Sequence, residues 1–177
     1  MSNCADSIKR INEINQMDFA YREEVIFSGL KCYMKSLLGE YLDESDLQHL
    51  ADALRTLRNR PYGASVDDLG LEPVTEALRI GSLIIPSKSV RKDELALVFY
   101  NLAPYAVLTR RETAQFAKAM FPNLFASVST ICSTLTKFYA ADGSLSEIPQ
   151  SFSVVVLPDH TPETMENICY ELGKQSN

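Results

Sequence analysis

The feature that most constrains the fold of this chain is the spacing of its apolar residues, which return every three or four positions along most of its length. Such spacing places side chains on one face of an α-helix. Glycine is scarce, with 7 among 177 residues, which disfavours a β architecture with many turns. We therefore predict a mainly α protein of six to eight helices.

The N-terminal third predicts an antiparallel pair of helices. Residues 4–16 suit a short helix, and a longer helix is expected from about Asp18 to Leu42. A second helix should begin at residues 43–46, where Ser45 and Gln48 have the spacing of a capping box. The apolar faces that should pack together are Ile26, Leu30, Tyr33 and Leu37 on one helix, and Leu47, Leu50, Leu54 and Leu57 on the other.

Further helices are predicted in the remainder of the chain. One should begin at Pro73 and end near Gly81, and another should run from a cap at Ser89 to about Ala103. A final helix should begin at Thr161 and Pro162 and end at Gly173, because glycine often follows the last helical turn.

The stretch from residue 108 to 140 predicts two capped helices joined by a turn. Thr109 and Glu112 have capping-box spacing, and Pro122 with Asn123 breaks the helical pattern. Ser127 or Ser129 could cap the second helix. This arrangement is similar to a helix-turn-helix, which presents a helix to a DNA groove.

The second helix of this unit should present a polar outer face. At 100° per residue its apolar side chains lie on one side, opposite small hydroxyl residues and one lysine. Hydroxyl and basic groups can contact phosphates and base edges. The candidate nucleic-acid-binding residues are Arg110, Arg111, Lys118, Ser129, Thr130, Ser133 and Lys137. An ordinary solvent-exposed helix face would have the same composition.

The charges of the chain are unevenly distributed. Residues 1–78 carry 8 basic against 14 acidic residues, residues 79–140 carry 8 against 3, and residues 141–177 carry 1 against 6. The net charge is −6, so the chain as a whole would not attract nucleic acid. The middle section, at +5, contains the helix-turn-helix-like unit.

A small β-hairpin, called a wing, is predicted beside this unit. Residues 151–157 are rich in β-branched side chains and end before Pro158, which is typical of a strand. Its partner would be residues 137–141 or 145–148. We predict an N-terminal helical domain over 1–84 and a winged-helix-like domain over 85–177.

No motif in the sequence indicates catalysis, a cofactor or a metal site. Cys4, Cys32, Cys132 and Cys169 are dispersed and lack metal-ligand spacing, so reduced thiols and a cytoplasmic location are expected. Neither a signal peptide nor an apolar stretch long enough to span a membrane is visible.

The segment Lys88–Phe138 resembles the carboxy-terminal part of RteC-type regulators of bacterial conjugative transposons. The similar elements are the helix Leu95–Leu102, the Thr109–Glu112 helix start, Phe121 with Asn123, and Leu135 to Phe138. The resemblance implies a helical, winged-helix DNA-binding protein. This chain departs from that family in having only Lys137 where the family has a more basic helix end.

Two hypotheses follow from the sequence. The first is a DNA-binding regulatory or accessory protein that uses the 109–139 unit on double-stranded DNA. The second is a helical protein–protein interaction module without nucleic-acid binding or catalysis. The sequence leaves the oligomeric state open.

Overall fold

A computed structural model describes residues 3–74, 84–85, 88–89, 92–139, 152–157 and 159–176; for Asn3 and residues 84–85 and 88–89 it describes the backbone only. The mainly α class is confirmed within these residues. The helices are α1 (Asn3–Leu38), α2 (Glu44–Arg58), α4 (Lys92–Leu102), α5 (Arg110–Met120), α6 (Val128–Tyr139) and α7 (Pro162–Gln175), with two short 3₁₀ helices, η1 (Asp67–Leu69) and η2 (Ala103–Ala106).

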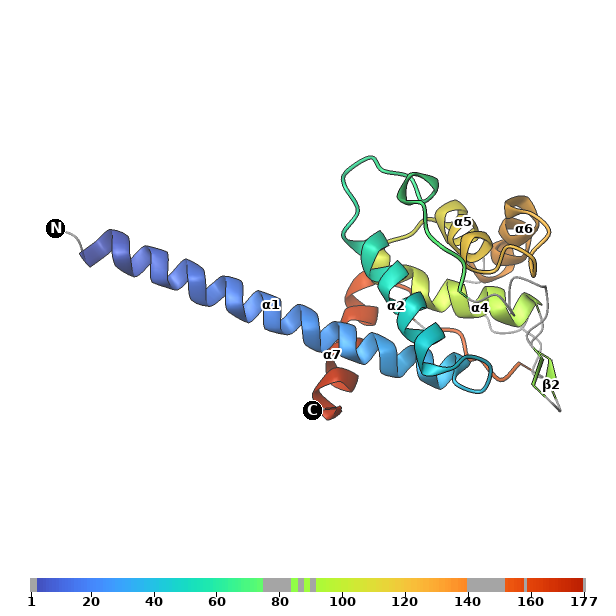
Figure 1. The fold of residues 1–177 in the computed structure, drawn as a ribbon, viewed down its shortest axis with the longest axis horizontal. Coiled ribbons are helices and arrows are strands. Elements are labelled where there is room, and N and C mark those ends of the chain that lie inside the picture. The colour runs from blue at the N-terminus through green and yellow to red at the C-terminus, as the bar shows by residue number, and fades with distance from the viewer. Residues whose placement is uncertain are drawn as a thin grey trace.

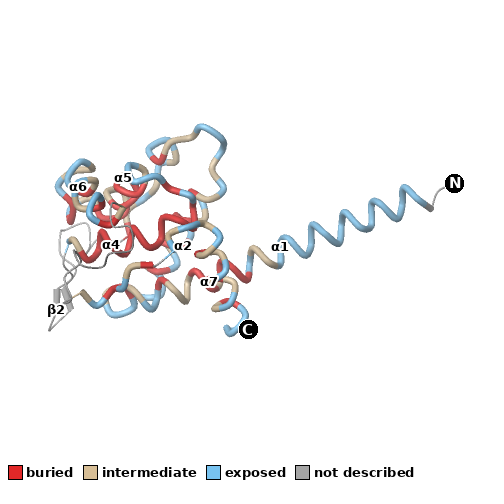
Figure 2. Tube along the Cα trace, turned by 180° about the vertical axis from the view of Figure 1, so that it is seen from behind, coloured by how far each residue is buried: buried red, intermediate tan, exposed pale blue. Residues whose placement is uncertain are grey.

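The longest element is α1, whose N-terminal half projects away from the rest of the molecule (Figure 1). The two helices predicted over 4–16 and 18–42 are one helix, because neither proline nor glycine separates them. Figure 2 shows the projecting half as exposed and the other half as mostly buried or intermediate. The helix ends at Leu38, before Gly39 in the following turn.

The buried half of α1 packs against α7 and α2, elements from both ends of the chain (Figure 1). α1 and α7 approach very closely: a Cβ added to Gly29 would lie 1.6 Å from the carbonyl oxygen of Cys169, and one added to Gly173 would lie 1.9 Å from that of Val25. Gly173 therefore lies inside α7 as a contact residue. The prediction that it ends the helix was wrong, because close helix packing and not termination explains this glycine.

The pairing of α2 with α1 is confirmed, and the predicted leucine face of α2 is buried. The residue that caps α2 differs from the prediction. Asp43 is the N-cap, and its side chain accepts a hydrogen bond of 2.9 Å from the backbone N–H of Asp46. Ser45 lies inside the first turn, where its hydroxyl cannot cap the helix.

α4 lies at the centre of the second half of the molecule. Every residue from Glu94 to Leu102 is buried, and both α5 and α6 pack on this helix. The Phe99 ring makes edge contacts with Phe116 and Phe121, with centroids 5.3 and 5.7 Å apart. The hydrophobic core extends without interruption from Ile26 on α1 to Cys169 on α7. The division into two domains at residue 84 stays a prediction.

The predicted wing is absent from the described part of the chain. Residues 152–157 form no strand, and α6 continues through Lys137 to Tyr139. The reason lies in two buried polar side chains of α4. Glu94 accepts a hydrogen bond of 2.6 Å from the N–H of Ser153, and Asn101 donates to the carbonyl of Val155 (2.8 Å) and accepts from the N–H of Leu157 (3.0 Å). These bonds replace those of a strand partner.

The middle of the chain tests the predicted helix cap at Ser89. In the structure β1 (Ile84–Ile85) pairs antiparallel with β2 (Lys88–Ser89), with Ile84 opposite Ser89. Ser89 is therefore in a strand and does not cap α4, which begins at Lys92. The helix predicted from Pro73 falls mostly outside the described residues.

Candidate nucleic-acid interface

The predicted pair of capped helices is present as α5 and α6. Thr109 and Glu112 form both bonds of the capping box, at 3.3 and 2.8 Å. Ser127 caps α6 by accepting a hydrogen bond of 3.2 Å from the N–H of Thr130, so the cap is Ser127 and not Ser129. The connection from 121 to 127 is longer than the three or four residues of a helix-turn-helix turn. Phe121, Leu124 and Phe125 on this connection are buried.

A groove of about 550 Å³ separates the start of α5 from the outer face of α6. It brings together four of the seven candidate residues, namely Arg110, Arg111, Ser129 and Ser133. Three further lining residues, Val128, Cys132 and Thr136, were not among the candidates. The sequence contained a signal for these three residues. Positions 128, 132 and 136 are four residues apart, while 132 follows 129 by three and 136 follows 133 by three, so all of them belong to one helix face.

The two arginines of the groove have different surroundings. Arg110 donates a hydrogen bond of 3.1 Å to the hydroxyl oxygen of Thr136, which holds its guanidinium across the groove. Arg111 is exposed and makes no hydrogen bond or ion pair with any described residue. Its donors are available to a ligand, and a guanidinium can bind a phosphate through two parallel hydrogen bonds.

Two of the hydroxyl groups that line the groove on α6 donate to the backbone of their own helix. Ser133 donates to the carbonyl oxygen of Ser129 (3.0 Å), and Thr136 donates to that of Cys132 (2.9 Å). In this arrangement their hydrogens are directed at carbonyl oxygens, so the hydroxyls face the groove as acceptors. Phosphate oxygens are also acceptors, so the charged donors for an anion in this groove are those of the arginines.

Lys118 does not belong to the groove. Its ammonium group donates to the carbonyl oxygens of Pro122, Phe125 (2.6 Å) and Ala126 (3.5 Å). The side chain thus ties the end of α5 to the connection that follows it. The prediction that Lys118 remains for solvent or phosphate was wrong, because the folded connection directs three carbonyl groups at its ammonium group.

Thr130 and Lys137 are exposed on α6 but are not among the groove-lining residues. The Thr130 hydroxyl lies 2.9 Å from that of Ser127, at the helix cap. Lys137 is in the last turn, where its positive charge interacts favourably with the negative end of the helix dipole. Of these two residues, Lys137 alone adds charge to the outer face of α6.

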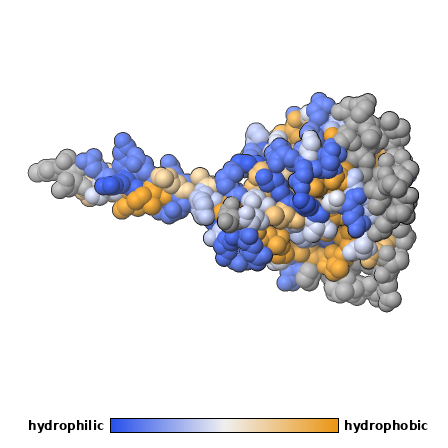
Figure 3. Space-filling view, turned by 60° about the horizontal axis from the view of Figure 1, so that its bottom comes forward, coloured by the Kyte–Doolittle hydropathy of each residue, from blue (hydrophilic) through white to orange (hydrophobic). Residues whose placement is uncertain are grey.

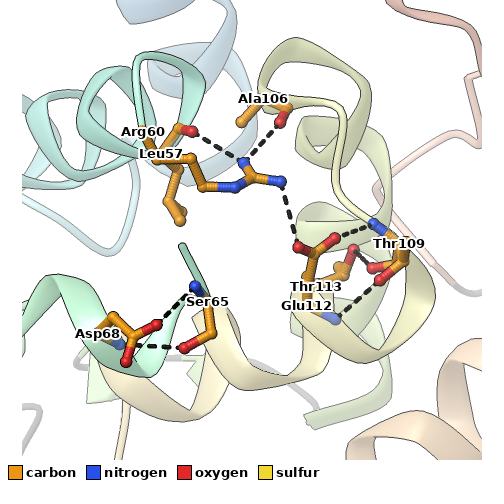
Figure 4. A network of polar contacts seen from close by, with 8 residues as sticks. All are labelled: Leu57, Arg60, Ser65, Asp68, Ala106, Thr109, Glu112 and Thr113. Carbon is orange, nitrogen blue, oxygen red and sulfur yellow. Dashed lines mark hydrogen bonds and ion pairs between the residues drawn. The ribbon is translucent and has the colours of Figure 1, made fainter. Parts of the chain in front are cut away.

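The acidic residue nearest to these arginines in sequence, Glu112, is neutralised within the fold (Figure 4). Its carboxylate accepts from Arg60 at 3.1 Å and from the backbone N–H of Thr109 at 2.8 Å. Arg60 in turn donates to the carbonyl oxygens of Leu57 (2.8 Å) and Ala106 (3.1 Å). Within α5 and α6, Glu112 is the only acidic residue, and it is outnumbered by Arg110, Arg111 and Lys137.

A titratable group with two aromatic neighbours, His160, lies outside the groove. Its ring stacks on Tyr100 with centroids 3.8 Å apart, and it contacts the edge of Tyr139. Burial lowers the pKa of His160, which the hydrogen bond to the Tyr100 carbonyl opposes. Among the described residues, no three His, Cys, Asp or Glu side chains gather as a metal site would require.

In comparisons with families of known proteins, curated proteins and solved structures, no match to this chain is found. Within its described residues, none of the helices has both the length and the apolar character needed to cross a membrane.

Proposed function

We propose that the protein binds double-stranded DNA, as a regulatory or accessory factor, through a basic face formed by Arg110, Arg111 and Lys137 beside the α5–α6 groove. The observation that carries this proposal is the charge balance of the face. Its three cations are exposed, while Glu112 is paired with Arg60 and α6 has no acidic residue. A local positive field attracts a polyanion even where the net charge of the protein is negative.

The expected contacts are with the phosphate backbone. Guanidinium and ammonium groups position a protein on a duplex, whereas base edges must be read by side chains with free donors and acceptors. The hydroxyls of Ser133 and Thr136 direct their hydrogens at their own helix, so they offer no donor to a phosphate, and the phosphate contacts are expected from the arginines and Lys137. The resemblance to RteC-type regulators supports a regulatory role, and the four free thiols accord with a cytoplasmic location.

The proposal is tested by titrating labelled duplex DNA at low and at physiological salt. Each lost phosphate contact lowers the slope of log K against log salt by about 0.9. For an Arg110→Ala/Arg111→Ala variant we expect weaker binding and a slope lower by about two units. The control is Lys9→Ala/Lys174→Ala, which removes the same charge from exposed sites on α1 and α7.

A further arm of this experiment replaces the hydroxyl in the middle of the groove. Ser133→Glu places a carboxylate beside the arginines, so it should abolish duplex binding. Since Ser133 is exposed, the free energy of unfolding should stay nearly unchanged. Equal binding by the wild type, the arginine variant and the Ser133 variant would contradict the proposal.

A second candidate function is a helical protein–protein interaction module that binds no nucleic acid. The observation that favours it is the exposure of large apolar side chains on the projecting half of α1. If the wild type binds no duplex even at low salt, this second candidate is the better account.

A further inference from the structure

The projecting half of α1 exposes apolar side chains that a soluble monomer would normally bury. Every side chain from Cys4 to Tyr21 is exposed. Figure 3 shows apolar surface along this projection. The large exposed apolar residues are Ile8, Ile11, Ile14, Met17, Phe19 and Tyr21. Contiguous apolar surface of this kind marks an interaction site.

The composition of the segment also requires a partner. Isoleucine, asparagine, serine and aspartate are weaker helix formers than alanine or leucine, and they make up much of residues 6–18. A helix in water gains most of its stability from packing of an apolar face, and short isolated helices are marginal. Pairs such as Asp6 with Arg10 and Lys9 with Glu13, four residues apart, add only a few tenths of a kcal/mol each. Packing must supply the rest.

One line of side chains has the spacing of a coiled-coil seam. Steps of three and four residues connect Cys4, Ser7, Ile11, Ile14, Asp18 and Tyr21. At 100° per residue these six positions fall within about 100° of the helix circumference. Ile8 and Met17 flank this seam on either side, whereas Phe19 lies about 110° from its middle.

We propose that this seam pairs antiparallel with the same seam of a second copy of the chain. In antiparallel pairs a first heptad position of one helix faces a fourth position of the other. Here each facing pair consists of two positions whose numbers add up to 25: 4 with 21, 7 with 18, and 11 with 14. Ile11 then meets Ile14 of the second copy on both sides of the axis. Ser7 meets Asp18, and Cys4 meets Tyr21. Apolar layers face apolar layers, a hydroxyl faces a carboxylate, and the overlap covers residues 4–21, the part of α1 in which every side chain is exposed.

The charges of the segment favour this arrangement over its alternatives. In a parallel pair Asp18 would face Asp18 of the second copy inside the seam, which opposes two like charges at close range. In the antiparallel pair the two Asp18 side chains lie at opposite ends. Residues 4–21 carry Lys9 and Arg10 against Asp6, Glu13 and Asp18, a net charge of −1. A second copy therefore meets little repulsion, and a nucleic acid would meet no basic surface.

Sedimentation equilibrium of the full chain tests the pairing. The wild type should be a dimer that dissociates on dilution. Ile11→Asp/Ile14→Asp removes the central apolar layers and should raise the dimer dissociation constant by at least about 1,000-fold. Both residues are exposed in the single chain, so near-ultraviolet circular dichroism of the variant should match that of the wild type at a dilution where the wild type is dissociated. Phe19→Asp is the control: it changes a residue that is more exposed than either isoleucine and lies off the seam, and this variant should remain dimeric.

Disulfide cross-linking tests the direction, in a chain with Cys4, Cys32 and Cys132 changed to Ser. Residues 11 and 14 of opposite copies should be within the Cα separation of about 4.4–6.8 Å that a disulfide needs. A mixture of the Ile11→Cys and Ile14→Cys proteins should therefore cross-link on oxidation, and neither protein alone should. In a parallel pair each protein alone would cross-link.

Three results would overturn the inference: a monomeric wild type at all concentrations, a dimer that survives the double aspartate change, or cross-linking of each cysteine protein alone. None of these depends on DNA binding. Failure of the dimer and failure of the proposed function are therefore separate outcomes.

Discussion

At the scale of single residues, the role of a charged side chain depends on which partners the fold brings to it. Lys118 belongs to the basic section of the sequence, yet its ammonium group is occupied by carbonyl oxygens of the α5–α6 connection. Arg111 is in the same section and is free of such partners among the described residues. The two cations should therefore respond to substitution in opposite ways.

Replacing Lys118 by Met keeps the length of the side chain and removes its hydrogen bonds. Because the carbonyls of Pro122 and Phe125 lose a charged donor, the free energy of unfolding should fall by about 1–3 kcal/mol. The salt dependence of duplex binding should be unchanged. Urea denaturation and duplex titration measure the two quantities. A lower salt slope with unchanged stability would return Lys118 to the DNA-binding residues.

His160 should make stability depend on pH. Its folded pKa is lowered from the ordinary value of 6.5, chiefly because burial disfavours the charged ring. Just below pH 6.5 the unfolded chain therefore binds more protons than the folded one, and the free energy of unfolding should fall as the pH falls. His160→Phe keeps a ring against Tyr100 and cannot titrate. The unfolding free energies of wild type and variant, measured by urea denaturation from pH 7.5 to 5, should converge or cross. If the two unfolding free energies change with pH in parallel, His160 is not the cause of the loss of stability at low pH.

At the scale of elements, the contact between α1 and α7 depends on two glycines. Gly29→Ala or Gly173→Ala would place a methyl group against a backbone carbonyl of the other helix, which cannot move without separating the helices. We expect each change to lower the free energy of unfolding by about 1–3 kcal/mol, although alanine is the better helix former. Asn167→Ala is the control, since it replaces an exposed residue of α7 by the same alanine. Unfolding by urea measures all three, and a stabilised Gly173→Ala would contradict the close contact.

At the scale of the whole molecule, the question is whether the two predicted domains unfold together. The core that begins at Ile26 on α1 includes α4, α5, α6 and Cys169 on α7, so elements on both sides of residue 84 share it. A shared core favours one cooperative transition.

Leu54→Ala tests this cooperativity. Leu54 is fully buried in α2, and its truncation should cost about 2–5 kcal/mol. If the molecule unfolds as one unit, the transition of α5 and α6 should shift by the same free energy as that of α1 and α2. Hydrogen exchange of amides in the two halves measures each separately. An unshifted transition for α5 and α6 would support the boundary at residue 84, and a cost below about 0.5 kcal/mol would mean that Leu54 is not core.

What the sequence by itself determined were the features that depend on residues within one or two helical turns. The periodic apolar residues predicted the mainly α fold and the buried face of α2, and the spacing of Thr109 and Glu112 predicted a capping box that is present. The 100° projection of α6 also predicted that Ser129 and Ser133 share one outer face, and both line the groove with the arginines. These interactions are local, so the order of residues nearly specifies their geometry.

Only the tertiary structure decided the features that depend on residues far apart in the chain. Residues 152–157 have the composition of a strand, but Glu94 and Asn101 bind their backbone groups from more than 50 positions away. In the sequence Gly173 is typical of a helix end, but in the structure it allows α1 to pack closely. Lys118 is predicted to be free, but the connection after α5 supplies carbonyl groups to its ammonium group. In each case the local pattern allowed two conformations or two partners. Burial selected between them, because a buried donor, acceptor or backbone contact must be satisfied by whatever the fold places beside it.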